Sequence, residues 1–221
     1  IKAGETISVT SKNTREKGQI ILDKTGIETG SDLWNDNYSL AGNTFEIRKD
    51  SPTGEIVQEM TTDENGHAET PKEITDALEL GTYYVTETKA SNGFVNTFKP
   101  VKVELKYANQ TVALVTSNVK GQNQEITGET TLTKEDKDTG DKTQGKAEFK
   151  GAEYTLFTAK DGQAVKWSEA FKPELVKGTK ASDETLTLTL DEKNQVAVKH
   201  LTFNEYYWQE TKAPEGYTLD E

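Results

Sequence analysis

The sequence predicts an all-β protein composed of two tandem β-sandwich domains, and three observations lead to this prediction. Thr recurs beside Val, Leu and Tyr in short runs, a pattern that favours strands over helices. Hydrophobic residues make up only 32% of the 221 residues, which is low for one large core but adequate for two small sandwiches with hydrated outer faces. The third observation is an internal repeat, which sets the number of domains at two.

The repeat opens with a Lys-containing element and ends with a Glu-containing element. Residues 22–30 and 132–140 share a Lys that is followed five and six residues later by Thr-Gly. Residues 83–90 and 206–213 share a Tyr-Tyr pair and, shortly after it, Glu-Thr-Lys-Ala. The Lys elements lie 110 residues apart and the Glu elements 123 apart. The second copy therefore carries about 13 extra residues, which we place within 168–183.

Short alternating segments fill each repeat. Residues 101–107 and 185–190 alternate in side-chain character with a period of two, which indicates half-buried strands. Several strands this short at regular spacing are typical of a sandwich or barrel. A polar stretch at 121–128 contains two Gly residues and marks the junction. We therefore expect a first domain at 17–126 and a second domain at 127–221.

The first residues of the chain resemble a strand that ends a domain. Residues 7–13 are similar to residues 114–118, which precede the second Lys element. Residues 1–16 are therefore expected to form a leading strand that closes a preceding or complemented domain. By the same comparison, the second domain is expected to lack its closing strand.

Strand parity directs a Lys, a Glu and an Asn toward the core, because alternate side chains of a strand face the same way. The neighbours on the same face are apolar or aromatic, apart from intervening Thr and Ser residues. Buried charges are costly unless they are paired or neutralised, so these positions are candidates for chemistry or for a structural ion pair. The residues are Lys24, Glu87 and Asn118 in the first repeat, Lys134 and Glu210 in the second, and Asn13 in the leading segment.

Charge and composition argue against several classes of function. The net charge of -12 repels a phosphate backbone, so no nucleic-acid partner is expected. Cysteine is absent, which removes disulfides, thiolate nucleophiles and cysteine metal sites. His67 and His200 lie in different repeats without a third ligand nearby, so neither a metal nor a cofactor is expected. No run of 18 apolar residues occurs, so no membrane insertion is expected in this part of the chain.

Residues 206–217, with the sequence Tyr-Tyr-Trp-Gln-Glu-Thr-Lys-Ala-Pro-Glu-Gly-Tyr, resemble the E-box of Cna-type B domains. These domains have the SpaA-like prealbumin fold, an immunoglobulin-like sandwich found in Gram-positive adhesins and pilins. Residues 134–140 and 151–154 are similar to the opening strands of that family. The first repeat fits more loosely, because its E-box lacks the Pro and ends in Phe94. The resemblance covers nearly the whole chain.

The resemblance implies an autocatalytic isopeptide bond inside each domain. In the first domain it implies that Lys24 is the nucleophile, Glu87 the acid and base, and Asn118 the acceptor. Their burial fits this chemistry, since it favours a neutral amine and a protonated carboxyl group. A Lys24–Asn118 bond would close a loop of about 95 residues and add roughly 4–5 kcal/mol in the chain-entropy model.

The acceptor of the second domain is left open by the sequence. Lys134 and Glu210 take the corresponding roles, and three sources could supply the Asn. These are residues beyond 221, Asn13 of the same chain, and Asn13 of a neighbouring molecule through intermolecular strand complementation.

Together these features favour a stalk of an extracellular, cell-wall-attached adhesin or pilin-like protein, whose partners are adjacent domains of the same surface protein. Its only expected chemistry is the single-turnover formation of the bonds, so it is not classed as an enzyme. The alternative is a module that binds a host ligand, in the extracellular matrix or on the cell surface. The aromatic residues Trp167 and Phe171, in and beside the insertion, are the candidate surface for that alternative.

Overall fold

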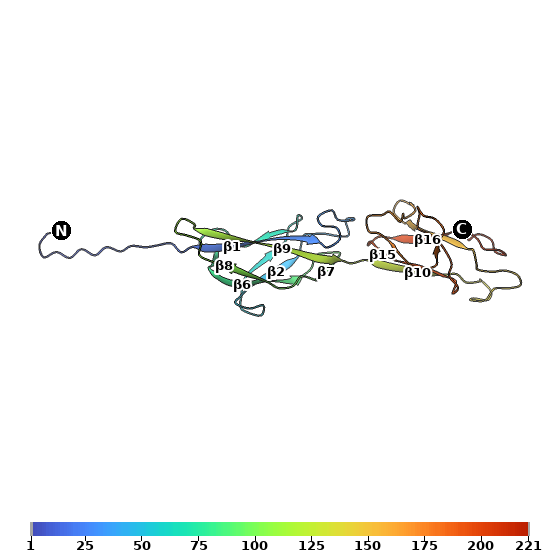
Figure 1. Ribbon diagram of the computed structural model, residues 1–221, viewed down its shortest axis with the longest axis horizontal. Helices are drawn as coiled ribbons and strands as arrows, with labels where there is room; N and C mark the ends of the chain where they lie inside the picture. The colour runs from blue at the N-terminus through green and yellow to red at the C-terminus, as the bar shows by residue number, and fades with distance from the viewer. Residues whose placement is uncertain (1, 221) are drawn as a thin grey trace. The chain divides into compact units, whose positions relative to one another are not determined.

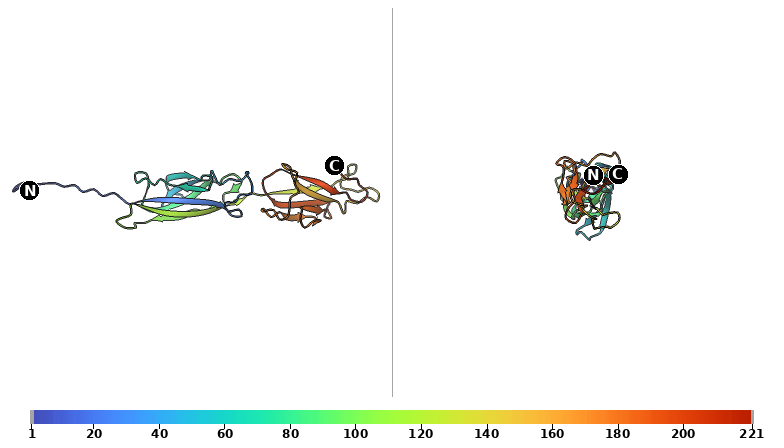
Figure 2. Two further views of the ribbon diagram at one scale, coloured as in Figure 1. Left: turned by 90° about the horizontal axis from the view of Figure 1, so that it is seen from above. Right: turned by 90° about the vertical axis from the view of Figure 1, so that its right-hand side faces the viewer.

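The computed structural model describes residues 2–220, which form sixteen strands and no helix (Figure 1). It divides into two compact units (Figure 2). One unit runs to Ser31 and resumes at Ser39–Gln124, and the other consists of Asp32–Tyr38 and the chain from Glu125 onward. No helix in the described chain is long and apolar enough to cross a membrane. The prediction of two tandem all-β domains is confirmed.

The first unit is a sandwich of two sheets. Its core lies between them and includes Ile20, Leu22, Phe45 and Val85, which are almost fully buried. One sheet has the order β4 (His67–Glu69), β1 (Lys17–Gly26), β9 (Leu114–Glu125), β7 (Phe94–Val95), with β5 (Leu78–Glu79) also paired to β1. The other has the order β3 (Ile56–Thr61), β2 (Thr44–Lys49), β6 (Gly81–Lys89), β8 (Val101–Leu105).

Strand β9 closes the first unit by lying parallel to β1. The two strands pair over the full length of β1, from Lys17 opposite Leu114 to Gly26 opposite Asn123. A parallel pair of strands requires a long crossover connection, and here the rest of the unit supplies it. The first and last strands of the unit are therefore neighbours.

The second unit repeats this plan with fewer strands. Its core includes Leu156, Leu186, Leu188, Val196 and Val198. Sheets of the order β10-β15-β12 and β13-β14-β11-β16 face this core. The strands are β10 (Gly128–Thr133), β11 (Glu153–Thr158), β12 (Glu174–Lys177), β13 (Thr179–Lys180), β14 (Thr187–Thr189), β15 (Gln195–Leu201) and β16 (Tyr206–Lys212).

Residues Asp32–Tyr38, which the sequence placed in the first domain, group with the second unit. Trp34 packs edge-on against Phe171 and His200, with ring centroids 6.4 Å and 5.8 Å apart. The hydroxyl of Tyr38 donates a hydrogen bond to the carbonyl of Ile126 at 2.7 Å. Aromatic packing therefore decides the grouping of this loop, which its place in the sequence does not reveal.

The leading segment differs from the prediction of a strand. Residues 2–16 carry no strand, and Figure 1 draws them as an extended trace before β1. Val9 and Ile7 are 88% and 60% exposed. A strand is stabilised by pairing with a neighbour, and this segment has no sheet partner in the described chain.

Candidate isopeptide site

The candidate site of the first unit is built around a buried ion pair. Lys24 points inward from β1 and Glu87 from β6, and their side chains are 1% and 0% exposed. The two atoms Lys24 Nζ and Glu87 Oε1 lie 3.5 Å apart. Lys24 Nζ has no hydrogen-bond partner, although it lies 5.0 Å from the ring centroid of Phe98. Among the described residues, Glu87 is therefore the charged partner of this amine, at a distance longer than a normal hydrogen bond.

Asn123 of β9 completes the site from the neighbouring strand. Its Nδ2 donates a hydrogen bond of 2.8 Å to Glu87 Oε1, the atom that also contacts Lys24. Its Oδ1 accepts hydrogen bonds from the backbone N–H groups of Thr97 at 3.1 Å and Phe98 at 3.2 Å. Two N–H groups directed at one carbonyl oxygen form the kind of arrangement that stabilises an oxyanion.

Gly121 allows β9 to approach the Lys24 side chain closely. The residue lies opposite Lys24 in the parallel ladder. A Cβ atom at this position would lie 2.5 Å from Phe98 Cε2 and 3.3 Å from Lys24 Cδ. Any larger residue would therefore displace Phe98 or the lysine stem, and with them the backbone that holds Asn123.

Burial moves the pKa of both charged groups toward their neutral forms. Desolvation lowers the pKa of Lys24 to about 8, although the nearby Glu87 carboxylate acts to raise it. Desolvation also raises the pKa of Glu87, against the opposing effects of Lys24 and Asn123. A buried amine with a lowered pKa is a better nucleophile at neutral pH than an exposed lysine.

The structure places Asn118, the acceptor predicted from strand parity, away from Lys24 and Glu87. Asn118 is exposed on the outer face of β9, opposite Ile21, whereas Asn123 is buried beside Glu87. The two positions differ by five residues, an odd number, so they face opposite ways along the strand. The repeat already held the signal for Asn123, because it stands 11 residues before Lys134, as Asn13 stands 11 residues before Lys24.

Two further residues escaped the sequence analysis. Asn43 is buried, accepts a hydrogen bond from the backbone of Ser91 and lies 3.5 Å from Asn123 Nδ2. Phe98 forms one wall of the site. Neither residue lies in an alternating run that would have marked it as inward-facing, so only the tertiary structure shows their place.

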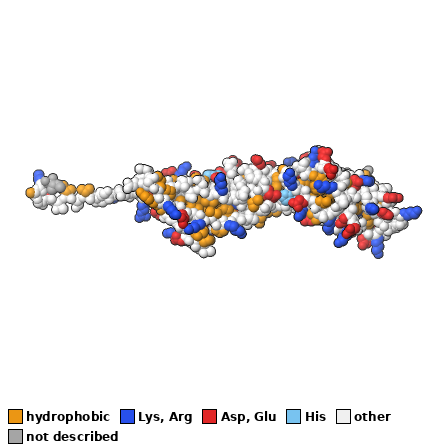
Figure 3. Space-filling view, in the orientation of Figure 1, with side chains coloured by type: hydrophobic (Ala, Val, Ile, Leu, Met, Phe, Trp, Pro, Cys, Tyr) orange, Lys and Arg blue, Asp and Glu red, His pale blue; other side chains and the backbone are white. Residues whose placement is uncertain are grey.

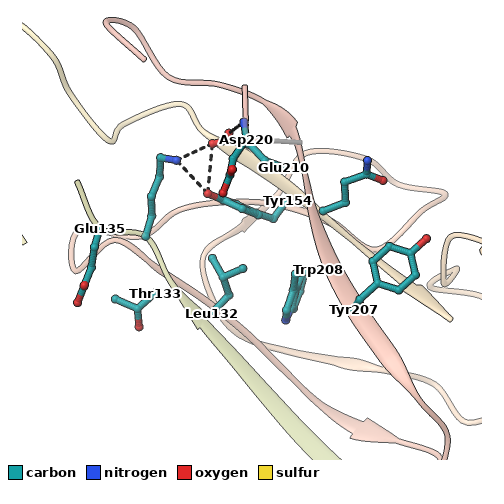
Figure 4. Close-up of a pocket in the computed structure, with 10 residues that line it drawn as sticks. Leu132, Thr133, Glu135, Tyr154, Tyr207, Trp208, Glu210 and Asp220 are labelled. Carbon is teal, nitrogen blue, oxygen red and sulfur yellow. Dashed lines mark hydrogen bonds and ion pairs between the residues drawn. The ribbon is translucent and has the colours of Figure 1, made fainter. Parts of the chain in front are cut away.

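The second unit contains the corresponding ion pair in a more open setting. Lys134 Nζ lies 2.7 Å from Glu210 Oε1 and 3.1 Å from the hydroxyl of Tyr154 (Figure 4). The Lys134 and Glu210 side chains are 10% and 1% exposed. The backbone N–H of Asp220 donates to Glu210 Oε2 at 2.9 Å. Burial acts to lower the pKa of Lys134, but its contacts with Glu210 and Tyr154 outweigh burial and raise it.

The structure does not place an acceptor Asn beside Lys134. Asn13 is exposed in the leading segment of the first unit and lines a pocket with Tyr107 and residues 109–113. Among the described residues that line the pocket at Lys134, none is an Asn. The source of an acceptor for Lys134 stays open.

The two aromatic residues predicted to form a ligand surface differ in their burial. Phe171 is buried in the core of the second unit beside Trp34. Trp167 is half-buried, donates from Nε1 to the carbonyl of Ser182 at 3.0 Å, and lies under the ammonium group of Lys180. The face drawn in Figure 3 carries acidic, basic and hydrophobic side chains interspersed. Phe171 is thus not available at the surface, and the ligand surface predicted at Trp167 and Phe171 stays a prediction.

Comparison with known proteins agrees with the fold and the repeat. The model of the SpaA prealbumin-like fold domain matches the chain twice, over residues 18–120 and 128–221, and the chain belongs to this family. The predicted resemblance is thereby confirmed. No curated protein matches the chain.

The solved structures of two pilins and of the TIE protein are similar to this chain. The TIE protein of Bacillus anthracis is 25% identical with a TM-score of 0.61, and the match covers 93% of this chain but 30% of that one. A streptococcal ancillary pilin is 20% identical, with a TM-score of 0.37 and coverage of 94% and 57%. The major pilin SpaD of Corynebacterium diphtheriae is 23% identical, with a TM-score of 0.36 and coverage of 87% and 53%. The chain thus spans less than two thirds of each.

Proposed function

We propose that the first unit forms an isopeptide bond between Lys24 and Asn123, with Glu87 as the proton carrier. The observation that supports this most directly is the shared contact of Lys24 Nζ and Asn123 Nδ2 with Glu87 Oε1 in a buried site. The fold brings the three groups together once, so a slow amide exchange becomes an intramolecular reaction.

The proton balance of the reaction follows from the contacts. Lys24 passes a proton to Glu87, and the neutral amine attacks Cγ of Asn123 to form a new C–N bond. The N–H groups of Thr97 and Phe98 stabilise the oxygen that becomes negative. The former carboxamide nitrogen takes protons from Glu87 and from the attacking amine, and the old C–N bond breaks. Nitrogen leaves as ammonium, and Glu87 is again a carboxylate.

We further propose that the chain is part of the stalk of a Gram-positive surface protein that is attached to the cell wall. The support comes from its membership of the SpaA family and from its tandem arrangement of small domains. In this role the isopeptide bond joins the first and last strands of the unit, β1 and β9, through which load would enter and leave. The partners are neighbouring domains of the same surface protein.

Intact-mass spectrometry tests the proposed bond directly. The purified chain should be lighter than its sequence by one ammonia, and tryptic mapping should recover a branched peptide that contains Lys24 and Asn123. The Asn123→Ala variant should have the full mass of its own sequence. The matched control is Asn118→Ala on the exposed face of the same strand, which should still lose one ammonia. If the chain without substitutions has the full mass of its sequence, the bond is ruled out.

A further inference from the structure

Asn43 is a buried residue whose side-chain amide is held at both ends. It stands one residue before β2 and is 1% exposed. Its Nδ2 donates hydrogen bonds to the carbonyl of Leu40 at 2.9 Å and to the hydroxyl of Thr62 at 3.0 Å. Its Oδ1 accepts a hydrogen bond of 2.9 Å from the backbone N–H of Ser91. These contacts fix the direction of Oδ1, which lies 3.5 Å from Nδ2 of Asn123.

The contact with Asn123 is directed at the nitrogen that leaves in the reaction proposed above. A carboxamide nitrogen carries two hydrogens. Glu87 Oε1 accepts a hydrogen bond from Asn123 Nδ2 at 2.8 Å, and Asn43 Oδ1 is the second oxygen that this nitrogen faces. At 3.5 Å the second contact is long for a hydrogen bond between neutral groups. It therefore contributes little while Asn123 is intact.

The same contact gains strength as the reaction proceeds. Asn123 Nδ2 takes up protons and becomes ammonium, so positive charge develops on it. Hydrogen bonds from a charged donor are shorter and about twice as strong as those between neutral groups. Catalytic hydrogen bonds that are long in the resting state often tighten only as the reacting geometry forms. An interaction that is stronger in the transition state than before it lowers the barrier.

The second unit shows that the fold does not require Asn43. The pairing of β2 with β6 and of β11 with β16 aligns the two units, and by this alignment Asn43 corresponds to Ala152 and Ser91 to Pro214. Alanine has no side-chain amide, and proline has no backbone N–H to hold one. The first unit therefore contains both the acceptor and the donor that orients it, whereas the second unit has neither at these positions.

We propose that Asn43 is a catalytic residue of the first unit, whose Oδ1 accepts a hydrogen bond from the nitrogen of Asn123 as it leaves. This inference rests on the Lys24–Asn123 bond proposed above. Lys24 still attacks Cγ, Glu87 still carries the proton and ammonium still leaves, so Asn43 neither gains nor loses a proton. Its hydrogen bond favours the step in which the old C–N bond breaks. Ser91 acts through Asn43 as a positioning residue.

The rate of ammonia loss after refolding, followed by mass spectrometry of the full chain, tests this role. Asn43→Ala should lose ammonia roughly tenfold more slowly than the chain without substitutions, the effect expected of one hydrogen bond. The control is Asn118→Ala on the exposed face of β9, which should keep the original rate. Circular dichroism should show the same strand content in all three chains.

Two variants of Ser91 keep the test decisive if Asn43→Ala does not fold. Ser91→Pro removes the N–H that holds Asn43 Oδ1 and introduces the residue that the second unit has there. Ser91→Ala removes the same hydroxyl but keeps the N–H. Ser91→Pro should therefore lose ammonia several-fold more slowly than Ser91→Ala.

NMR of a chain that cannot react separates this role from a merely structural one. In Lys24→Met, the side-chain amide of Asn123 should give two proton signals, one for the hydrogen that faces Glu87 and one for the hydrogen that faces Asn43. Adding Asn43→Ala should shift mainly the second signal. The loss of a purely structural contact would shift both signals or neither.

The measurements distinguish the role of Asn43 from the bond itself. If the chain without substitutions keeps the full mass of its sequence, no bond forms and both proposals are overturned. If that chain loses ammonia, and Asn43→Ala loses it equally fast or the two Ser91 variants react at the same rate, the Lys24–Asn123 bond stands and the role of Asn43 is overturned. An unshifted Asn123 signal in Lys24→Met with Asn43→Ala would overturn that role as well.

Discussion

The chemistry proposed for the first unit depends on the desolvation of one lysine, Lys24. Lys24 is buried among apolar side chains, and its only charged contact is Glu87 at 3.5 Å in the described chain. A buried ion pair of this kind contributes little to stability in itself, because desolvation offsets the attraction. Its value lies in reactivity, since a neutral amine and a protonated acid can form by passing one proton between the partners.

At this scale, Glu87→Gln should block the bond while leaving the fold in place. Gln can still accept the hydrogen bond from Asn123 Nδ2, but it cannot take the proton of Lys24. The variant should retain the full mass of its sequence after prolonged incubation, with strand content unchanged by circular dichroism. If this variant lost ammonia as fast as the chain without substitutions, Glu87 would not be the proton carrier.

The lowered pKa of Lys24 also predicts a pH dependence in a chain that cannot form the bond. Burial lowers the pKa of Lys24 to about 8 in the chain with Asn123, below the ordinary value of about 10.5, and the Asn123→Ala variant keeps this burial, so its Lys24 should keep a lowered pKa. Between these values the unfolded state binds more protons, so the free energy of unfolding should rise with pH. Urea denaturation from pH 8 to pH 10 should show an increase on the order of 1–2 kcal/mol.

The control for this titration removes the buried charges altogether. Lys24→Met and Glu87→Gln, added to Asn123→Ala, should abolish the rise between pH 8 and pH 10. A rise of the same size in both variants would assign it to other groups.

At the scale of elements, strand β9 determines the geometry of the site, and the sequence revealed it only in part. The sequence predicted the strands that carry Lys24 and Glu87, because their patterns occur in both repeats. It also predicted that both side chains face the core, because each shares a strand face with apolar neighbours. The position of Asn123 was not predicted, because strand parity was counted from Asn118 with Leu114 and Val112, and Val112 lies before the start of β9. The place of Phe98 and the grouping of Asp32–Tyr38 depend on tertiary packing, which no local pattern encodes.

Gly121→Val should test the close approach of β9 to Lys24. The new side chain would meet Phe98 at less than van der Waals distance, so overpacking should cost about 1–3 kcal/mol and slow the loss of ammonia. Asn118→Val adds a similar side chain to the exposed face of the same strand and should form the bond normally. Mass spectra taken over time after refolding measure both rates. Equal rates would show that Gly121 does not control the approach.

For the first unit as a whole, the proposed bond decides where tension travels. Load that enters at β1 reaches Lys24 after a few residues and can pass directly to Asn123 and out through the end of β9. The loop between these two residues, about 100 residues long, is then shielded from the load, and closing it lowers the entropy of the unfolded chain by roughly 4–5 kcal/mol in free energy.

Force spectroscopy on the full chain should make this shielding visible. In Asn123→Ala, unfolding of the first unit should release the whole loop, an added contour length of roughly 35 nm. In the chain without substitutions and in Asn118→Ala, that step should be missing, because the bond holds the two ends of the loop together. The second unit serves as an internal reference, since its own unfolding step should be the same in all three chains. If the chain without substitutions also showed an unfolding step of roughly 35 nm for the first unit, Lys24 and Asn123 would not carry the load.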